Sequence, residues 1–488
     1  MTQLTPRKLF AIIFILAMFG FSVRVARDPD LFWHLKTGEY ILENGIPRQD
    51  PPFSFTVTDH EWITHEWLTQ IFMIWVHDNL GGLRGLSIVF ALLIALAFTL
   101  LMWASDGWSY IAGASAFWGI AASLPFLNAR PQMFNILFGA WIVFVVEQIK
   151  RGRLSIRWVW SFPVLLLFWV NMHGGFLLAF AILGVYVIGE GLQYFIQGER
   201  EDGLEWSQIV SLTIASTASF LITLANPNTY RMWLYAFETL TSDAMRDTIT
   251  EWQSPNFHVW IFWVFGFMVM ATFFLMIFSK RPVLFSDALF IAGTTFAGLQ
   301  SVRNIPLFAL VAVPIMSRHL LGLFVGTPSY ALLSGDAPDP PVSSTLRTLN
   351  WVMVALALVG SIVFANEQLK DTEEVILAEF PVEAIDWLED EGLSQERIFN
   401  DYEWGGYMIW REVPTFIDGR ADVFGDEFIY FYMQTYTRQD NWREPLDEHD
   451  VEYILTKTGG GLRVLIDEAV EWEPVYEDDV STIFSRTN

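Results

Sequence analysis

Two carboxylates, Asp28 and Asp30, stand directly after the first long apolar stretch of the chain, residues 9–26. Carboxylates at the water-facing end of a membrane helix suit a polar substrate, because each can accept a proton or hold a cation. Arg7 and Lys8 precede the apolar stretch, so the excess of positive charge places the N-terminus in the cytoplasm. Any chemistry of Asp28 and Asp30 is therefore predicted to be extracytoplasmic.

Cationic side chains at the ends of other apolar stretches could complement these carboxylates. Arg130 and Arg303 are each predicted at the outer end of a span, and a guanidinium matches phosphate oxygens with two parallel hydrogen bonds. His173, in the sequence NMHGG, lies where a span surfaces and could donate to a phosphate or bind a metal with Asp28 or Asp30. A transfer from a phosphate-bearing donor would need such a set, with a carboxylate activating the acceptor and cations stabilising the departing phosphate.

The composition predicts a membrane protein. Of the 488 residues, 53% are hydrophobic, 22 are Trp and 42 are Phe, and the mean hydropathy is +0.36. Soluble domains do not reach these values without repeated apolar runs. The chain has no cysteine, which excludes disulfides and thiolate metal sites. The first apolar stretch lacks a small-residue cleavage site and is predicted to be a retained anchor.

Apolar runs of sufficient length predict a polytopic α-helical protein with about eleven spans. They are residues 9–26, 86–104, 108–125, 134–149, 157–171, 175–196, 207–225, 259–279, 284–300, 305–325 and 349–366. The basic loops around 150–157 and 280–281 fall on the cytoplasmic side in this threading. We therefore expect a multi-pass protein of the plasma membrane whose C-terminus lies outside.

Two domains are predicted. Residues 1–366 form the transmembrane domain, with external loops 27–85 and 226–258 and an internal, Gly/Pro/Ser-rich linker at 326–348. Residues 367–488 hold 31 Asp and Glu against 9 Lys and Arg, which argues against nucleic acid or anionic lipid as a partner.

Local patterns in this tail predict a small extracytoplasmic domain of mixed α/β structure. Helical spacing covers 382–391, strand-like stretches cover 414–418 and 452–456, and Gly405-Gly406 reads as a turn. The loop 416–426, with three carboxylates and one arginine, is predicted to fold beside the turn at 401–407 and to help form an acceptor groove.

A histidine- and glutamate-containing segment in the first loop superficially resembles a metal site. His60, Glu61, His65 and Glu66 stand in DHEWITHEW, but the two histidines are five residues apart, one more than a shared helical face allows. The tryptophans around them instead predict an amphipathic segment lying on the membrane surface.

Several motifs, in order, resemble the catalytic subunit of oligosaccharyltransferases, within the GT-C superfamily of lipid-dependent membrane glycosyltransferases. Residues 29–45, PDLFWHLKTGEYILENG, are similar to the start of that family's first external loop, and TITE at 248–251 to its T-I-x-E motif. DYEWGGY at 401–407 is similar to the W-W-D-Y-G motif. Where the family carries an acidic pair, loop 126–133 offers Asn128, Arg130 and Gln132.

The resemblance implies a GT-C fold and transfer of a sugar or oligosaccharide from a polyprenyl-linked donor to a protein or glycan acceptor at the bilayer. It places the family's metal- and acceptor-binding carboxylate on Asp30, with Asp28 beside it, and Mg²⁺ or Mn²⁺ as the cofactor. It places Lys36 at the family's basic position and Glu251 in the catalytic set. The residues it implies for the acceptor are Asp401, Tyr402, Glu403 and Trp404.

Other functions stay open at this point. Polymerases and ligases of surface polysaccharide use lipid-pyrophosphate donors without a metal. A transporter of lipid-linked glycans would carry charges inside its spans and show internal repeats, whereas the spans here read as nearly charge-free and unrepeated. A non-catalytic scaffold would explain a large external domain but not carboxylates and arginines converging from four separate loops.

Overall fold

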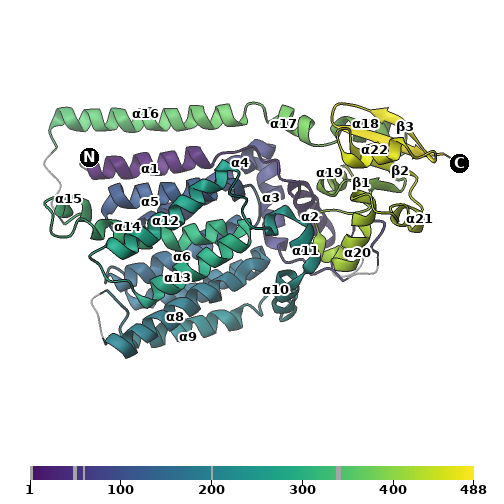
Figure 1. Ribbon diagram of the computed structural model, residues 1–488. Coiled ribbons are helices and arrows are strands. Elements are labelled where there is room, and N and C mark those ends of the chain that lie inside the picture. Colours follow the sequence, from purple (N-terminus) through teal and green to yellow (C-terminus); the bar gives the residue numbers. More distant parts are fainter. Residues whose placement is uncertain (1–3, 48–51, 59–60, 199–201, 337–341, 488) are drawn as a thin grey trace. The chain divides into compact units, whose positions relative to one another are not determined.

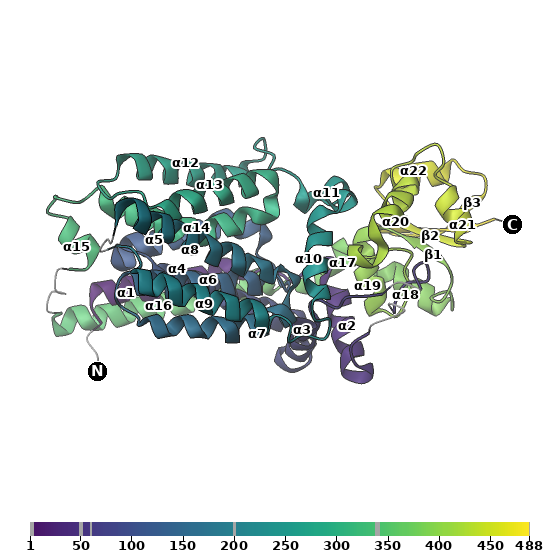
Figure 2. The ribbon, with the colours of Figure 1, turned by 90° about the horizontal axis from the view of Figure 1, so that it is seen from below.

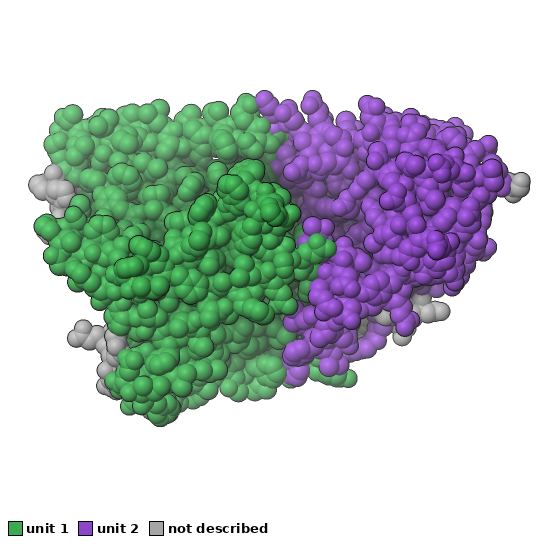
Figure 3. Space-filling view, in the orientation of Figure 1, with its two compact units in different colours: residues 1–24, 87–230, 251–369 green, residues 25–86, 231–250, 370–488 purple. Residues whose placement is uncertain are grey.

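The computed structural model describes residues 4–47, 52–58, 61–198, 202–336 and 342–487. The chain divides into two compact units, which Figure 3 shows in different colours. The first unit comprises Met1–Arg24, Ser87–Tyr230 and Glu251–Leu369. The second comprises Val25–Leu86, Arg231–Thr250 and Lys370–Asn488.

The first unit is helical, and each of the eleven predicted apolar ranges holds an α-helix. These helices are α1 (Pro6–Ser22), α4 (Gly82–Ala104), α5 (Trp108–Ser123), α6 (Met133–Lys150), α7 (Ser161–Met172), α8 (Leu177–Gln197), α9 (Trp206–Ile222), α12 (Trp263–Phe278), α13 (Phe285–Gln300), α14 (Ile305–Gly322) and α16 (Ser344–Leu369). The short α15 (Tyr330–Ser334) lies in the predicted linker, of which 337–341 fall outside the described residues.

Short 3-10 turns connect several of these helices. They are η1 (Leu124–Phe126), η2 (Ile156–Trp160), η3 (Gly174–Phe176), η4 (Thr250–Trp252), η5 (Trp260–Phe262) and η6 (Val302–Asn304). Six helical segments of the described chain are long and apolar enough to cross a membrane, and α7 and α9 lie within shorter apolar ones. A multi-pass membrane protein is therefore confirmed, while the count of eleven spans stays a prediction.

The helices α1 and α16, at the two ends of the first unit in sequence, pack closely against each other. Figures 1 and 2 show α16 running beside α1, and the two helices pack together. The Ser361 hydroxyl donates to the Leu16 carbonyl at 2.9 Å, and the Asn350 amide donates to the Leu4 carbonyl at 2.8 Å. A small residue, Gly20, faces Ser361 at this contact, as is common where membrane helices approach closely.

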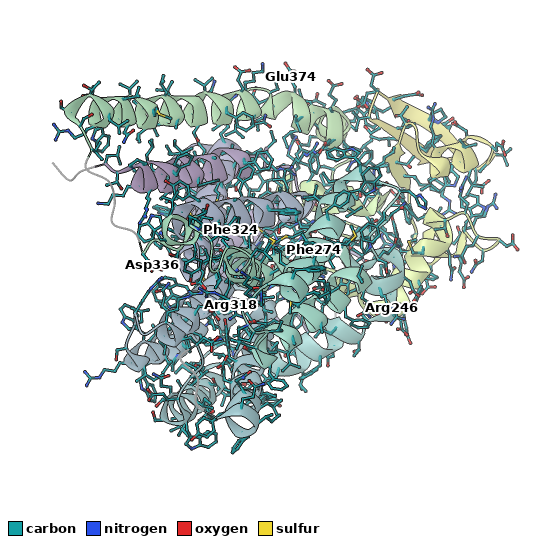
Figure 4. All side chains as sticks on the ribbon, turned by 60° about the vertical axis from the view of Figure 1, so that its left-hand side comes forward. Arg246, Phe274, Arg318, Phe324, Asp336 and Glu374 are labelled. Carbon is teal, nitrogen blue, oxygen red and sulfur yellow. The ribbon has the colours of Figure 1, made fainter. Side chains whose placement is uncertain are left out.

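The apolar spans carry few charges, but several of these charges are buried. Buried charges stand inside α6, α8, α13 and α14 and form ion pairs with one another. Lys150 lies 2.8 Å from Glu190 and 3.6 Å from Glu147, and Arg318, labelled in Figure 4, pairs with Asp287. Such charges persist in an apolar bundle because each is offset by an opposite one, and the pairs join α6 to α8 and α13 to α14.

The second unit combines helices with one small sheet. Its elements are α2 (Leu31–Asn44), α3 (Trp67–Leu80), α10 (Arg231–Thr241), α11 (Asp243–Thr248), α17 (Thr372–Glu379), α18 (Val382–Asp390), β1 (Ile398–Asn400), η7 (Tyr402–Trp404), α19 (Gly405–Trp410), α20 (Ala421–Tyr436), α21 (Glu444–Glu448), β2 (Tyr453–Lys457), α22 (Gly461–Asp467), β3 (Trp472–Glu477) and β4 (Ser481–Arg486). The predicted mixed α/β tail is confirmed, including its helix at 382–391 and its strand at 452–456.

The sheet has the order β1-β2-β4-β3. The β1–β2 pair is parallel, with Phe399 opposite Ile454, and the remaining pairs are antiparallel. A parallel pair needs a long crossover, and η7, α19, α20 and α21 supply it. The core beneath the sheet gathers apolar residues of α18, α19, β1, β2 and β4, among them Leu388, Met408 and Leu455.

The grouping of segments differs from the predicted boundary at 366. The segments Val25–Leu86 and Arg231–Thr250, predicted as loops of the membrane domain, group with the tail. Their apolar side chains explain this, because Phe32 of α2 packs edge-on against Phe380 and Tyr407, with ring centroids 5.0 and 5.1 Å away. The first loop thus completes the core of the tail.

Two local expectations in the tail are wrong. Residues 414–418 do not form a strand of the sheet: Thr415 makes a single parallel bridge to Ser54, and the Thr415 amide donates to the Phe53 carbonyl at 2.9 Å. Gly405-Gly406 is not a turn but the start of α19. Both glycines are needed for close packing, because a Cβ would overlap the Ile417 carbonyl at Gly405 and the Pro29 carbonyl at Gly406.

Candidate functional site

In the first unit, the predicted cations gather where four connections meet at helix ends. The Arg130 guanidinium, in the turn before α6, lies 2.7 Å from the Glu251 carboxylate of η4. The next residue, Trp252, supports Arg303, whose guanidinium carbon lies 4.5 Å from the indole centroid. Two predicted phosphate-binding residues and the predicted catalytic Glu251 therefore belong to one cluster.

Backbone contacts fix this cluster. The Ser301 hydroxyl donates to the Glu251 carbonyl at 2.9 Å, and the Val302 amide donates to the Gln253 carbonyl at 2.9 Å. These bonds join η4 to η6 across about 50 residues of sequence, so that Arg303 is held beside Trp252. A stacked guanidinium directs its N–H groups outward in its own plane, where they can meet phosphate oxygens.

His173 occupies the neighbouring connection between α7 and α8. Its ring is 9% exposed, and its Nδ1 accepts the Gly175 backbone N–H at 2.7 Å. The Asn135 amide, on the first turn of α6, lies 3.1 Å from the same Nδ1. Because the turn before Asn135 carries Arg130, His173 belongs to the same end of the helical unit as the arginine cluster.

In the second unit, Asp28 and Asp30 sit at the start of α2 with different partners. Asp28 is 5% exposed, and its Oδ1 accepts the Asp30 backbone N–H at 3.0 Å, so it shapes the helix start. The Asp30 Oδ1 accepts the Trp33 indole N–H at 3.0 Å. The Gly419 backbone lies so close to Asp30 that a Cβ at Gly419 would stand 3.1 Å from the Asp30 Cγ and overlap Oδ1.

Lys36 is engaged by two carboxylates of the second unit. Its Nζ lies 2.7 Å from Glu39 and 2.7 Å from Glu412. Burial alone would lower the pKa of Lys36, but the hydrogen bonds to Glu39 and Glu412 outweigh this effect and raise it. Lys36 therefore links α2 to the turn that follows α19, and its predicted contact with a phosphate stays untested.

The predicted acceptor residues divide into a polar cluster and a core residue. Asp401 is buried, and burial raises its pKa although Lys457 lies 3.5 Å away. Glu403 binds the same Lys457 at 2.5 Å, and the Tyr436 hydroxyl donates to Asp401 at 3.3 Å. Burial and the charge of Asp401 raise the pKa of Tyr436 to about 12, so it stays a donor at neutral pH.

Trp404 and Tyr402 have mainly structural contacts. The Trp404 side chain is 1% exposed, packs in the core and donates its indole N–H to the Glu379 carbonyl at 2.9 Å. The Tyr402 backbone N–H donates to the Tyr432 hydroxyl at 3.1 Å. We therefore assign Trp404 to the floor under the polar cluster, where its ring also lies 5.7 Å from the Lys457 ammonium.

Comparison with known proteins places this architecture. The sequence matches no known protein family and no curated protein. The structure is similar to the archaeal oligosaccharyltransferase AglB of Archaeoglobus fulgidus in complex with an inhibitory peptide and a dolichol-phosphate. The TM-score is 0.57 at 12% identity, over 92% of this chain and 69% of that one.

Two further structures agree. AglB tethered to an acceptor peptide with the NVT sequon gives a TM-score of 0.53 at 12% identity, over 99% of this chain and 74% of that one. ArnT of Cupriavidus metallidurans in the apo state gives 0.52 at 12% identity, over 96% of both chains. AglB and ArnT are both GT-C glycosyltransferases. The chain has the GT-C fold. This confirms the resemblance stated from the motifs and the predicted fold class apart from its span count.

The side chains of this chain are a poor fit for the implied metal. Among the described residues, no three His, Asp or Glu side chains group in a way that could hold an ion. Glu251, in the T-I-x-E motif, is engaged by Arg130, which stands where the family has an acidic pair. A guanidinium at this position offsets the carboxylate charge that a cation would need.

Sequence reasoning missed a buried network in the second unit. The His65 Nε2 lies 3.3 Å from Glu66 and 3.1 Å from the Tyr235 hydroxyl, and His34 lies 3.5 Å from Glu66. His60, discussed with them, falls outside the described residues. The signal in the sequence that could have revealed this network is the repeated His-Glu pair in DHEWITHEW, because a segment lying on the membrane surface does not require such a repeat.

A second missed feature is the Asp418–Arg420 ion pair. Both side chains are fully buried, with two hydrogen bonds at 2.8 and 2.7 Å. Arg420 also donates to the Pro52 carbonyl at 2.8 Å and stacks on Trp62, 5.0 Å from the ring centroid. The start of the predicted loop 416–426 does fold beside 401–407, because the Asn400 amide donates to the Ile417 carbonyl at 2.8 Å and a Cβ at Gly405 would overlap that carbonyl. Residues 421–426 are not a loop but the start of α20, and the acceptor groove stays a prediction.

Proposed function

We propose that this chain is a glycosyltransferase that moves a sugar or an oligosaccharide from a polyprenyl phosphate or pyrophosphate to an acceptor on the extracytoplasmic side. The observation that carries the proposal is the cluster of Arg130, Arg303 and Glu251 at one end of a GT-C helical unit. The AglB structure of the same fold holds a dolichol-phosphate, which supports a lipid-phosphate donor here.

The roles follow from the chemistry of the transfer. The bond between the anomeric carbon and the phosphate oxygen breaks, a bond from the acceptor to that carbon forms, and the acceptor loses a proton. Asp30, oriented by the Trp33 indole, is the group we assign to accept this proton. Arg303, held on Trp252, stabilises the negative charge left on the phosphate. Asp28 holds the helix start that presents Asp30.

We assign the charge compensation at the phosphate to arginine rather than to a divalent cation. Arg130 offsets Glu251, and the described residues hold no group of three His, Asp or Glu side chains that could bind a metal ion. A fork of guanidinium N–H groups supplies positive charge and directed hydrogen bonds together. Turnover is therefore expected to persist in EDTA, and its loss in EDTA with recovery on adding Mg²⁺ or Mn²⁺ would contradict this assignment.

The proposed acceptor is inferred from a charged cluster in the second unit. The Asp401, Glu403 and Lys457 cluster offers charged groups to an acceptor, and the AglB structures with bound peptides support a peptide. A second candidate function is a polymerase or ligase of surface polysaccharide. The replacement of the family's acidic pair by Arg130 favours it, since those enzymes work without a metal.

One pair of variants tests the proposal. Purified protein would be incubated with a short polyprenyl-linked sugar, and release of the polyprenyl phosphate would be followed. Asp30→Asn should lower turnover by about 10²-fold, as expected for a lost acid/base group, and Asp28→Asn should lower it less. Asp390→Asn, at an exposed carboxylate of α18, is the control and should leave turnover unchanged. Full activity of Asp30→Asn would refute the assigned role.

The sidedness needs its own experiment. In this cysteine-free chain, single cysteines at Val470 (94% exposed) and Leu42 (62% exposed) should react with a membrane-impermeant maleimide on intact cells. A cysteine at Arg153, predicted inside, should react only after the membrane is opened. Protection of either external position in intact cells would overturn the threading.

A further inference from the structure

The hydrogen bonds around His173 determine which ring nitrogen carries a proton. The Gly175 backbone N–H points at the His173 Nδ1 from 2.7 Å. A backbone N–H can only donate, so Nδ1 must present its lone pair. The geometry of the turn therefore requires the proton of a neutral ring to sit on Nε2.

The Asn135 amide is a second donor to the same nitrogen, and a hydrogen bond from Trp169 determines which end of that amide faces the ring. The Trp169 indole N–H donates to the Asn135 Oδ1 at 2.7 Å. An indole can only donate, so the orientation of the Asn135 amide is determined, and its NH₂ group is the side that lies 3.1 Å from the His173 Nδ1. Trp169 is fully buried, which holds this relay in place.

We infer that His173 is a neutral hydrogen-bond donor whose Nε2–H binds an oxygen of the donor phosphate, and that Asn135 and Trp169 are positioning residues that keep it in this tautomer. The inference rests on the proposed function, since it concerns the same lipid-phosphate donor. It also decides between the two roles open from the sequence. A metal bound at Nε2 would need the lone pair there, which would put the proton on Nδ1 against the Gly175 N–H.

The glycine and the arginine nearby fit this role. A Cβ at Gly175 would stand 2.5 Å from the Asn135 Nδ2 and 2.9 Å from the His173 Nδ1, so only glycine allows the two donors to meet the ring. Asn135 also follows Arg130 closely, and the Met133 amide donates to the Arg130 carbonyl at 3.1 Å in the turn between them. One turn thus carries Arg130 and, at its end, the Asn135 amide that contacts the His173 ring.

The tautomer can be measured directly. The full-length protein would be labelled with ¹⁵N-histidine, and the signals of His173 would be identified among the eight histidines by their absence in His173→Gln. We expect a protonated Nε2 and an unprotonated Nδ1. In Asn135→Asp a carboxylate replaces the second donor and competes with the Gly175 N–H, so the fraction of His173 rings with a protonated Nδ1 should rise above that of the unaltered protein. A protonated Nδ1 in the unaltered protein would overturn the inference.

Binding of farnesyl phosphate tests the ligand. A Gln amide can place an N–H near the position of Nε2, whereas an Asn amide reaches only that of Nδ1. His173→Gln should therefore bind nearly as well as the unaltered protein, and His173→Asn about tenfold more weakly, as expected for one lost hydrogen bond to a charged group. His258→Gln, the same change at an exposed histidine, is the control and should bind normally.

The outcomes separate this inference from the proposed function. Equal binding by His173→Gln and His173→Asn would refute the donor role even if the enzyme turns over. Absence of binding by every form, including the unaltered protein, would refute the lipid-phosphate donor and with it the role given to His173. In that case the ¹⁵N spectrum would still report on the relay itself.

Discussion

Replacing Gly419 by alanine should displace the Asp30 carboxylate without unfolding the protein. An added Cβ would overlap Oδ1 and stand 3.1 Å from Cγ and 3.0 Å from the Trp33 Nε1. Carbon atoms in contact prefer about 3.5–4.0 Å, so Cγ must retreat by roughly half an ångström and Oδ1 by more. The 3.0 Å hydrogen bond from Trp33 to Oδ1 would be lost or bent.

The expected loss of turnover is large compared with the loss of stability. A displacement on the order of 1 Å at a reacting group can lower the rate about 10²-fold. Overpacking by one methyl costs about 1–3 kcal/mol of stability, which is small for a membrane protein of this size. Turnover would be measured by release of polyprenyl phosphate, and stability by the thermal midpoint in detergent.

A matched glycine provides the control. Gly459, in the same unit, has nothing within 4 Å of an added Cβ, so Gly459→Ala should leave both quantities unchanged. If Gly419→Ala turned over normally at an unchanged thermal midpoint, Asp30 would not need its present position, and the carboxylate assignment would be refuted. If the variant lost turnover only in proportion to folded protein, the effect would be structural.

Three further predictions follow from named contacts. Arg303→Lys keeps the charge but loses the planar fork on Trp252, so turnover should fall about tenfold with lipid binding largely kept, and Arg303→Ala should impair both, measured by phosphate release and lipid binding. Arg130 and Glu251 contact each other at 2.7 Å, so the losses of turnover caused by Arg130→Gln and Glu251→Gln, expressed as free energies, should add up to more than the loss in the double variant. A double-mutant cycle with a coupling energy near zero would contradict this. Burial alone would lower the pKa of His65, but the charge of Glu66 outweighs this effect and raises the pKa above its ordinary 6.5. The thermal midpoint should therefore fall as the pH rises from 6.5 through the raised pKa. His65→Gln should flatten this pH dependence.

Features that depend on local sequence could be predicted, as particular helices and strands show. All eleven apolar ranges hold helices, because a run of some twenty apolar residues has few other ways to satisfy its backbone. The helix at 382–391 and the strand at 452–456 were likewise encoded by their own periodicity. The strand expected at 414–418 was wrong because, among the described residues, this segment makes a single bridge, from Thr415 to the distant Ser54.

The contacts that build the candidate site depend on distant partners, and local patterns cannot reveal them. Arg130 and Glu251 are 121 residues apart, and Tyr235 and His65 are 170 apart. Each residue type could be named from the sequence, yet the pairing depends on how helices pack. The buried charges of α6, α8, α13 and α14 escaped notice for the same reason, since a charge in a span is tolerated only with a partner from another helix.

The Arg130–Glu251 pair bears most directly on how a charged donor would be held. A lone carboxylate at Glu251 would repel a phosphate or recruit a cation to offset its charge, whereas a guanidinium at 2.7 Å offsets the charge from within the protein. Arg303 then contributes positive charge from the face of an indole, and His173 contributes a neutral N–H that its relay keeps on Nε2. A neutral donor adds directed hydrogen bonding without further charge, so binding through it should persist at high salt while the arginine contribution weakens. If these groups bind the donor as proposed, this end of the helical unit holds the anion through fixed protein groups, and its affinity for a lipid phosphate should be independent of added divalent cations.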